Sequence, residues 1–342
     1  MKAILLLAAI VGIAVASLPF ELWAQEANAE ATLRQLGNRV TRDDRLPGCP
    51  VVALYLAHVK ITDGYLKAFK ELKSLRSLDM AYTEVKDADL KELKEFDGLQ
   101  ELRLSSTQIT DIGLNELKDH SGLHKLDLTN TRITDAGLKE LRKHETLRNI
   151  GLRGTEITDA GLKDLKELTC LVELDLGQTK ITDAGMKDLK ELKGLQVLHL
   201  GGTNITDAGM KELKELKGLL ELDLSQTKIT DASLKELKEI KGLQTLRLGD
   251  TEVADAGLRE IKYLKGLQLL DLKHTKITDA GMKDLKELTS LRWLDVSVTR
   301  VTEAGIAQIR EALPPNITRI YYTYALPPVQ PKSQGPPLQN QR

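Results

Sequence analysis

The chain repeats one pattern of apolar and polar positions at a fixed step of 24 residues. One repeat reads L-x-x-L-x-L-x-x-T-x-I-T-D-A-G-L-K-x-L-K-x-L-K-G, and its positions are numbered 1 to 24 below. Threonine at position 9 marks the register in every repeat from Thr83 to Thr299, and Val59 holds the same place one step earlier. The range 51–313 therefore holds eleven repeats without insertion or deletion.

Each repeat is predicted to form a strand followed by a helix. Positions 4 and 6 are apolar with period two, which is typical of a strand with one buried face. Positions 16, 19 and 22 are apolar with a spacing of three, as in Leu234, Leu237 and Ile240, which predicts a helix. The pair Thr230 and Asp231 is predicted to cap the start of that helix, and Gly242 is expected to end it in a left-handed conformation.

A single strand and helix cannot bury their apolar side, but stacked neighbours can. In-phase repeats therefore predict an α/β solenoid in which the strands form a parallel sheet. Position 9 is expected to be buried, with its hydroxyl satisfying the backbone of the turn.

The repeat resembles the leucine-rich repeat family, whose motif is L-x-x-L-x-L-x-x-N/C-x-L. Threonine replaces Asn or Cys at position 9, and this departure resembles a bacterial secreted, planctomycete-like subtype with T-x-I-T-D-x-G-L repeats. The resemblance implies a curved solenoid with the sheet on its concave face and helices on its convex face. It implies protein recognition more often than catalysis.

The two ends of the chain differ from the repeats. One lysine, an apolar run over residues 3–18 and Pro19 indicate a signal peptide over residues 1–24, and a retained N-terminal anchor is the alternative. Residues 25–50 are expected to form an N-terminal cap, with an amphipathic helix from Ala27 to Val40. Residues 314–325 are predicted to add a closing strand, and the Pro- and Gln-rich residues 326–342 to form a disordered tail.

The amino-acid composition and the absence of catalytic motifs limit the classes of function expected for the chain. The 49 Lys and Arg residues balance 50 Asp and Glu residues, so the basic excess of a nucleic-acid-binding protein is missing. Cys49 and Cys170 lie five strands apart, too far for a disulfide, and are expected to be buried. The sequence holds no nucleophile, phosphate-loop or metal motif, which predicts a protein that is not an enzyme and needs no cofactor or metal.

Function is expected on the concave face, where positions 3, 5 and 7 of each strand are exposed. Position 5 alternates aspartate with other residues, and its row includes Asp175, His199, Asp223, Arg247, Asp271 and Asp295. The acids are expected to pair with Arg247 and to raise the pKa of His199. Three interpretations of this row are open. The alternation of charge serves only to avoid repulsion between strands, the row is a recognition strip for a partner, or the residues around His199 bind a divalent cation. The contact patch is placed at Leu269, Asp271, Lys273, Trp293 and Asp295, unless the closing strand covers Trp293.

The sequence thus predicts an exported binding scaffold that recognises a protein, peptide or surface polymer. Its expected location is extracellular, periplasmic or in the cell envelope, with no membrane span after signal cleavage. One alternative is a structural or assembly component of a cell envelope. Another is a substrate-recognition subunit similar to F-box leucine-rich repeat proteins. Neither the partner nor the oligomeric state follows from the sequence.

Overall fold

The computed structural model describes residues 39–61, 65–66, 69, 72–312 and 319–322. The chain divides into two compact units, unit 1 over residues 1–156 and unit 2 over residues 157–342. The predicted signal peptide, most of the predicted N-terminal cap and the predicted tail lie outside the described residues.

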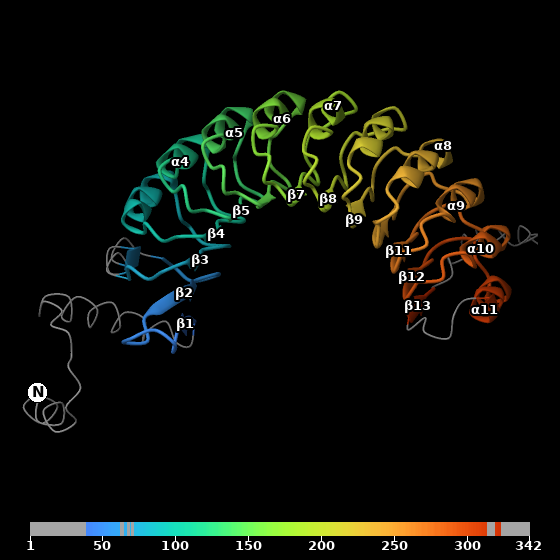
Figure 1. Cartoon of the computed structure of the whole chain (residues 1–342), viewed down its shortest axis with the longest axis horizontal. Helices are drawn as coiled ribbons and strands as arrows, with labels where there is room; N and C mark the ends of the chain where they lie inside the picture. The colour runs from blue at the N-terminus through green and yellow to red at the C-terminus, as the bar shows by residue number, and fades with distance from the viewer. Residues whose placement is uncertain (1–38, 62–64, 67–68, 70–71, 313–318, 323–342) are drawn as a thin grey trace, which may run out of the picture. The chain divides into compact units, whose positions relative to one another are not determined.

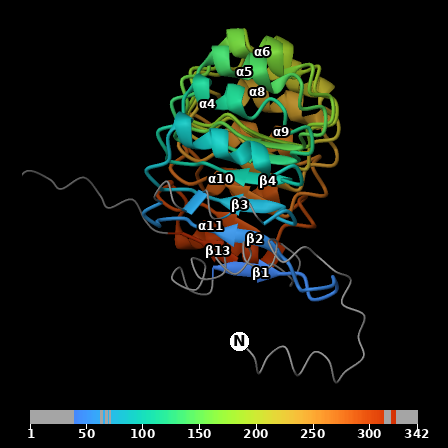
Figure 2. The same cartoon turned by 90° about the vertical axis from the view of Figure 1, so that its left-hand side faces the viewer.

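Short strands at positions 3 to 5 of the repeat form the sheet of each unit. The strands of unit 1 are β1 (Val40–Arg42), β2 (Val51–Tyr55), β3 (Ser77–Asp79), β4 (Glu101–Arg103), β5 (Lys125–Asp127) and β6 (Asn149–Gly151). The strands of unit 2 are β7 (Glu173–Asp175), β8 (Val197–His199), β9 (Glu221–Asp223), β10 (Thr245–Arg247), β11 (Leu269–Asp271), β12 (Trp293–Asp295) and β13 (Arg319–Tyr321). Within a unit they pair in chain order, and Figure 2 shows β1 to β4 stacked on one another.

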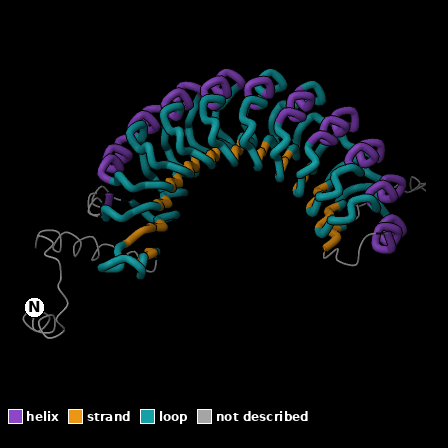
Figure 3. The backbone as a smooth tube through the Cα atoms, viewed as in Figure 1, coloured by secondary structure: helices purple, strands orange, loops and turns teal. Residues whose placement is uncertain are grey.

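Helical segments follow the strands on the other side of each unit. Those of unit 1 are η1 (Asp87–Glu95), α4 (Asp111–Glu116) and α5 (Asp135–Leu141). Those of unit 2 are α6 (Asp159–Leu165), α7 (Met186–Leu189), η2 (Gly209–Glu215), α8 (Asp231–Leu234), η3 (Lys235–Glu239), α9 (Asp255–Ile261), α10 (Asp279–Leu285) and α11 (Glu303–Ala312). Within each unit, strands and helices form two separate layers (Figures 1 and 3). We call the layer of strand side chains opposite the helices the strand face.

The register predicted from the repeat is confirmed by the pairing of the strands. In unit 2, Leu222 pairs with Leu246, and Leu246 pairs with Leu270, so each residue meets its equivalent in the next repeat. These leucines and the other apolar columns fill the space between the layers, and nearly all of their side chains are fully buried. Each buried side chain contributes about 1.5–3 kcal/mol before conformational entropy is subtracted, so the columns supply the main stabilisation.

The predicted helix over Leu234 to Ile240 divides into an α-helical turn, α8, and a 3-10 turn, η3. The physical reason is the spacing of Leu234, Leu237 and Ile240. Residues three apart eclipse one another in a 3-10 helix, which therefore presents all three apolar side chains to the same neighbours. Thr230 caps α8 as predicted, because its hydroxyl accepts a hydrogen bond from the backbone N–H of Ala232.

The turn after each strand depends on positions 8 and 9. As expected, the position 9 threonines are buried, and Thr227 donates its hydroxyl hydrogen to the carbonyl of Leu224 at 2.6 Å. The left-handed residue of the repeat lies at position 8, where Asn130, Gln226 and even β-branched Val298 have φ of 54–58°. The expectation of a left-handed Gly242 is wrong, because the helix has already ended at Ile240 through a 3-10 turn.

The aspartate at position 13 joins neighbouring repeats. The carboxylate of Asp183 accepts hydrogen bonds from both the backbone N–H and the hydroxyl of Thr206, at 2.8 and 2.6 Å. Oδ1 of Asp183 occupies the space beside Gly209. A Cβ at position 209 would lie only 2.5 Å from this oxygen. The T-D-A-G segment is therefore a link between repeats: threonine caps its own helix and aspartate holds the next repeat.

Two local expectations are corrected at the start of the chain. Val40 begins β1, which pairs antiparallel with β2, so the predicted helix does not extend to this residue. Cys49 and Cys170 are exposed instead of buried, because both lie in turns outside the apolar columns. At the other end, β13 lies inside the range predicted for the closing strand and pairs parallel with β12.

Candidate binding face on unit 2

All of the position 5 side chains selected from the sequence lie on one straight row of the strand face of unit 2. Asp175 pairs in register with His199, and His199 with Asp223. The row continues through Asp223, Arg247, Asp271 and Asp295, which pair in the same way on β9 to β12. All of these side chains are half-buried.

The aspartates of the row also have a structural role that the repeat pattern alone does not indicate. In each of them, Oδ1 accepts a hydrogen bond from the backbone N–H two residues later. The distances are 2.8 Å from Gly177 to Asp175, 2.9 Å from Ser225 to Asp223 and 2.8 Å from Ser297 to Asp295. An aspartate that bonds the backbone in this way stabilises the turn at the end of its strand. The alternation of aspartate is thus partly a property of the fold.

His199 and Arg247 meet at a residue outside the row, Glu221 at position 3 of β9. Nε2 of His199 lies 3.1 Å from Oε1 of Glu221, and the guanidinium of Arg247 pairs with the same carboxylate. Nδ1 of His199 faces Asp175 at 3.8 Å. The expected pairing of Arg247 with Asp223 and Asp271 is therefore wrong, because the guanidinium pairs instead with Glu221, two residues before Asp223 on β9.

The contacts within this network shift the pKa values of His199 and Glu221. The facing carboxylate of Asp175, together with the hydrogen bond and charge of Glu221, raises the pKa of His199 despite burial, as predicted, although the second partner is Glu221 instead of Asp223. Burial raises the pKa of Glu221, but bonds from Arg247 and His199 outweigh it and hold that pKa below its usual value. The network satisfies its own charges, which favours a structural role.

The next two strands carry carboxylates without such partners. Asp271 and Asp295 are adjacent in register, and among the described residues neither forms an ion pair. Burial raises the pKa of Asp271, and the negative charges of Asp295 and Asp223 raise it further, against the opposing effects of the Lys273 backbone N–H and Arg247. The carboxylates of Asp223, Asp271 and Asp295 therefore make the local potential negative, although Arg247 offsets part of it.

Apolar side chains lie beside these carboxylates at position 3. Leu269 on β11 pairs in register with Trp293 on β12, and both side chains are half-buried. The ring of Tyr321 on β13 lies 5.5 Å from that of Trp293, tilted by 47°. The closing strand thus contacts Trp293 without burying it completely. Lys273, two residues after β11, is exposed. We call Leu269, Asp271, Lys273, Trp293 and Asp295 the acidic–aromatic patch.

The described part of the chain holds neither a cluster of metal ligands nor a helix that could span a membrane. No group of three or more His, Cys, Asp or Glu side chains is placed there to hold a metal ion, so the considered cation site around His199 has too few ligands. None of the described helices has the length and hydrophobicity of a membrane-spanning segment.

Comparison with known proteins agrees with this geometry. A family model described as leucine rich repeat matches residues 193–253. A second model with that description matches residues 99–117, 123–141, 167–190 and 267–286. No curated protein sequence matches the chain. Together with the repeats of strand and helix, the matches support a leucine-rich repeat protein, and this fold suggests a binding scaffold.

Solved structures of the same class include two internalins of Listeria monocytogenes. Internalin InlF superposes with a TM-score of 0.55 at 19% identity, over 92% of this chain and 99% of its own. Internalin C2 gives a TM-score of 0.48 at 24% identity, over 62% of this chain and 84% of its own. A leucine-rich repeat protein of Leptospira interrogans gives 0.43 at 21% identity, over 76% and 80% of the two chains. The likeness to InlF supports the fold alone.

Proposed function

We propose that the protein is an exported, non-enzymatic binding scaffold whose acidic–aromatic patch recognises a basic segment of a protein or peptide. The single observation that carries the proposal is the adjacent pair Asp271 and Asp295, which lacks an ion-pair partner in the described residues. A lysine or arginine from a partner would lie between two carboxylates and offset the charges of Asp295 and Asp223, which add to the effect of burial in raising the pKa of Asp271.

Aromatic and aliphatic surface beside the carboxylates supports the same partner. The half-buried ring of Trp293 can contact the stem or the charged group of a lysine or arginine, a contact worth about 0.5–2 kcal/mol. Leu269 adds apolar area next to it. Because the strands hold these side chains in fixed register, little conformational entropy is lost on binding.

Export and the bacterial Thr-type subtype remain predictions from the sequence, carried by residues 1–24 and by threonine at position 9. Measurement of the N-terminus of the secreted protein tests the first of these predictions. A mature chain that begins after Ala24 agrees with a cleaved signal, and an intact Met1 in the envelope fraction agrees with a retained anchor.

The binding proposal is tested by selecting peptides from a random display library on the immobilised chain. We expect the selected peptides to be rich in Lys and Arg. We expect Asp271→Asn with Asp295→Asn to weaken their binding by about 1.4–4 kcal/mol, or about ten- to a thousandfold, because two charge-assisted contacts are lost. Asn at both positions keeps an acceptor for the strand-end turn.

Asp79→Asn is the matched control. This aspartate makes the same turn bond on β3, to the N–H of Ala81 at 3.0 Å, but lies in unit 1 beside Arg103. We therefore expect Asp79→Asn to leave the binding of the selected peptides unchanged. Selection of neutral or acidic peptides, or equal weakening by the control, would refute the proposal.

A further inference from the structure

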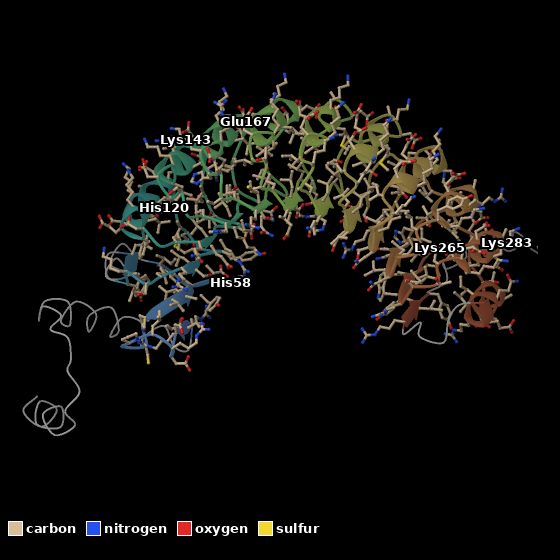
Figure 4. The ribbon with its side chains drawn as sticks, in the orientation of Figure 1. His58, His120, Lys143, Glu167, Lys265 and Lys283 are labelled. Carbon is tan, nitrogen blue, oxygen red and sulfur yellow. The ribbon has the colours of Figure 1, made fainter. Side chains whose placement is uncertain are left out.

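Two repeats of unit 1 carry histidine where their neighbours carry an apolar residue. Position 22 is Phe96 in the repeat before them and leucine or isoleucine at the equivalent places from 168 to 288 of unit 2, but it is His120 and His144 in between. Both imidazoles lie inside the apolar column, with exposed fractions of 5% and 1%. Figure 4 shows His120 in the body of unit 1.

The backbone offers each ring one partner. Nδ1 of His144 lies 3.0 Å from the carbonyl oxygen of His120, to which it donates a hydrogen bond, and the ring of His120 interacts in the same way with the backbone of Phe96. The other nitrogen, Nε2, is buried without a partner in both rings. Neutral imidazole fits this arrangement, since it has one N–H to donate and leaves Nε2 without hydrogen.

A proton on Nε2 would therefore enter a place with no acceptor. The charged groups that act on His120 are Asp97, Asp119 and Lys94, and those that act on His144 are Asp119 and His120 itself. The aspartates favour the proton, but burial has the larger effect and lowers the pKa of both rings. The two rings also oppose each other, because a charge on His120 disfavours one on His144.

We propose that His120 and His144 form an acid-sensitive break in the apolar column of unit 1, which opens the turns after α4 and α5 when the rings take protons. The folded unit binds fewer protons than its unfolded state, so its stability is full at neutral pH. That stability is lost as the pH falls below about 6.5, the value for unfolded histidine.

Hydrogen exchange of two backbone amides reports this opening directly. The N–H of Leu123 bonds the carbonyl of His120 at 3.2 Å, and the N–H of Leu147 bonds that of His144 at 3.0 Å. Between about pH 7 and about pH 5, we expect their protection factors, corrected for intrinsic exchange, to fall about tenfold or more.

Unit 2 supplies an internal control. The N–H of Leu195 makes the same bond to Leu192, a leucine at position 22, so its protection should not change. The double variant H120L/H144L should abolish the pH effect at Leu123 and Leu147. An equal fall at Leu195, or an effect that persists in the double variant, would overturn the proposal.

Titration of the wild-type imidazoles by NMR keeps the proposal testable if the double variant does not fold. We expect both rings to stay neutral in the folded chain well below about pH 6.5. Protonation of either ring at or above that pH, with the exchange pattern intact, would also overturn it.

Discussion

Ala254 is the one described place in unit 2 where the link between repeats lacks threonine at position 12. Its N–H still bonds Oδ1 of Asp231 at 2.7 Å, but it has no hydroxyl to bond Oδ2 or to cap α9. The backbone already has the conformation that threonine adopts at this position: φ and ψ are −131° and −169° at Ala254, and −127° and −177° at Thr230. Ala254→Thr should therefore enter without rearrangement and complete the link.

The expected gain follows from the two new bonds. A hydroxyl at the N-cap contributes about 1 kcal/mol relative to alanine. A hydrogen bond to the carboxylate of Asp231 contributes about 1.5–3 kcal/mol before the entropy of fixing the side chain is subtracted. We expect a net stabilisation of about 1–3 kcal/mol, concentrated in the repeat that contains α9.

Urea unfolding and hydrogen exchange of α9 measure this gain, and Ala254→Val is the matched control. Valine has the shape of threonine without the hydroxyl, so it should give none of the gain. The opposite change, Thr278→Ala, removes the hydroxyl bond to Asp255 and the cap bond from the N–H of Ala280 one repeat later, and it should cost a similar amount. Equal stability of the Thr and Val variants would refute the reasoning that the hydroxyl links the repeats.

Three further predictions concern single residues. Val298→Asn should stabilise unit 2 by about 1 kcal/mol in urea unfolding, because asparagine tolerates the left-handed φ of 56° better than a β-branched residue. Thr227→Val should destabilise it by about 1–3 kcal/mol in the same assay, since the buried carbonyl of Leu224 loses its hydroxyl partner. The raised pKa of His199 means that its contacts with Asp175 and Glu221 stabilise the fold below the unfolded pKa of about 6.5 and are lost as the pH rises through the folded pKa. The thermal midpoint should fall from about pH 6 to about pH 8, and it should not do so in His199→Gln.

The repeat made the fold predictable. Period two at positions 4 and 6 and the recurrence of Thr at position 9 placed the strands, the turn and the register, because any other phase would expose Leu222 and its equivalents. The type and the ends of the helices were less predictable from the sequence. The spacing of Leu234, Leu237 and Ile240 suits both an α-helix and a 3-10 helix, and only packing against neighbouring repeats decides between them.

The role of Asp at position 13 could not be read from one repeat. Beside a threonine that caps the helix, aspartate looks like a second cap, whereas Asp183 bonds Thr206 of the following repeat. The signal was present in the glycine at position 15, since Gly209 leaves room for that carboxylate. Such a contact depends on the distance between helices of adjacent repeats, which the sequence does not give.

The strand-face row was placed correctly, but its pairings were not all predicted. A ladder of equivalent positions suggests that Arg247 meets the aspartates beside it, whereas its long side chain reaches Glu221 in another column. That choice left Asp271 and Asp295 without ion-pair partners in the described residues, which is the feature that distinguishes the patch.

Binding at the acidic–aromatic patch is tested most directly by hydrogen exchange of the chain with and without a selected basic peptide. We expect the bound peptide to increase the protection of residues 269–275 and 293–299, on β11, β12 and the turns after them. The protection of α9 and α10 should change little. Protection confined to those helices or to unit 1 would contradict binding at the patch.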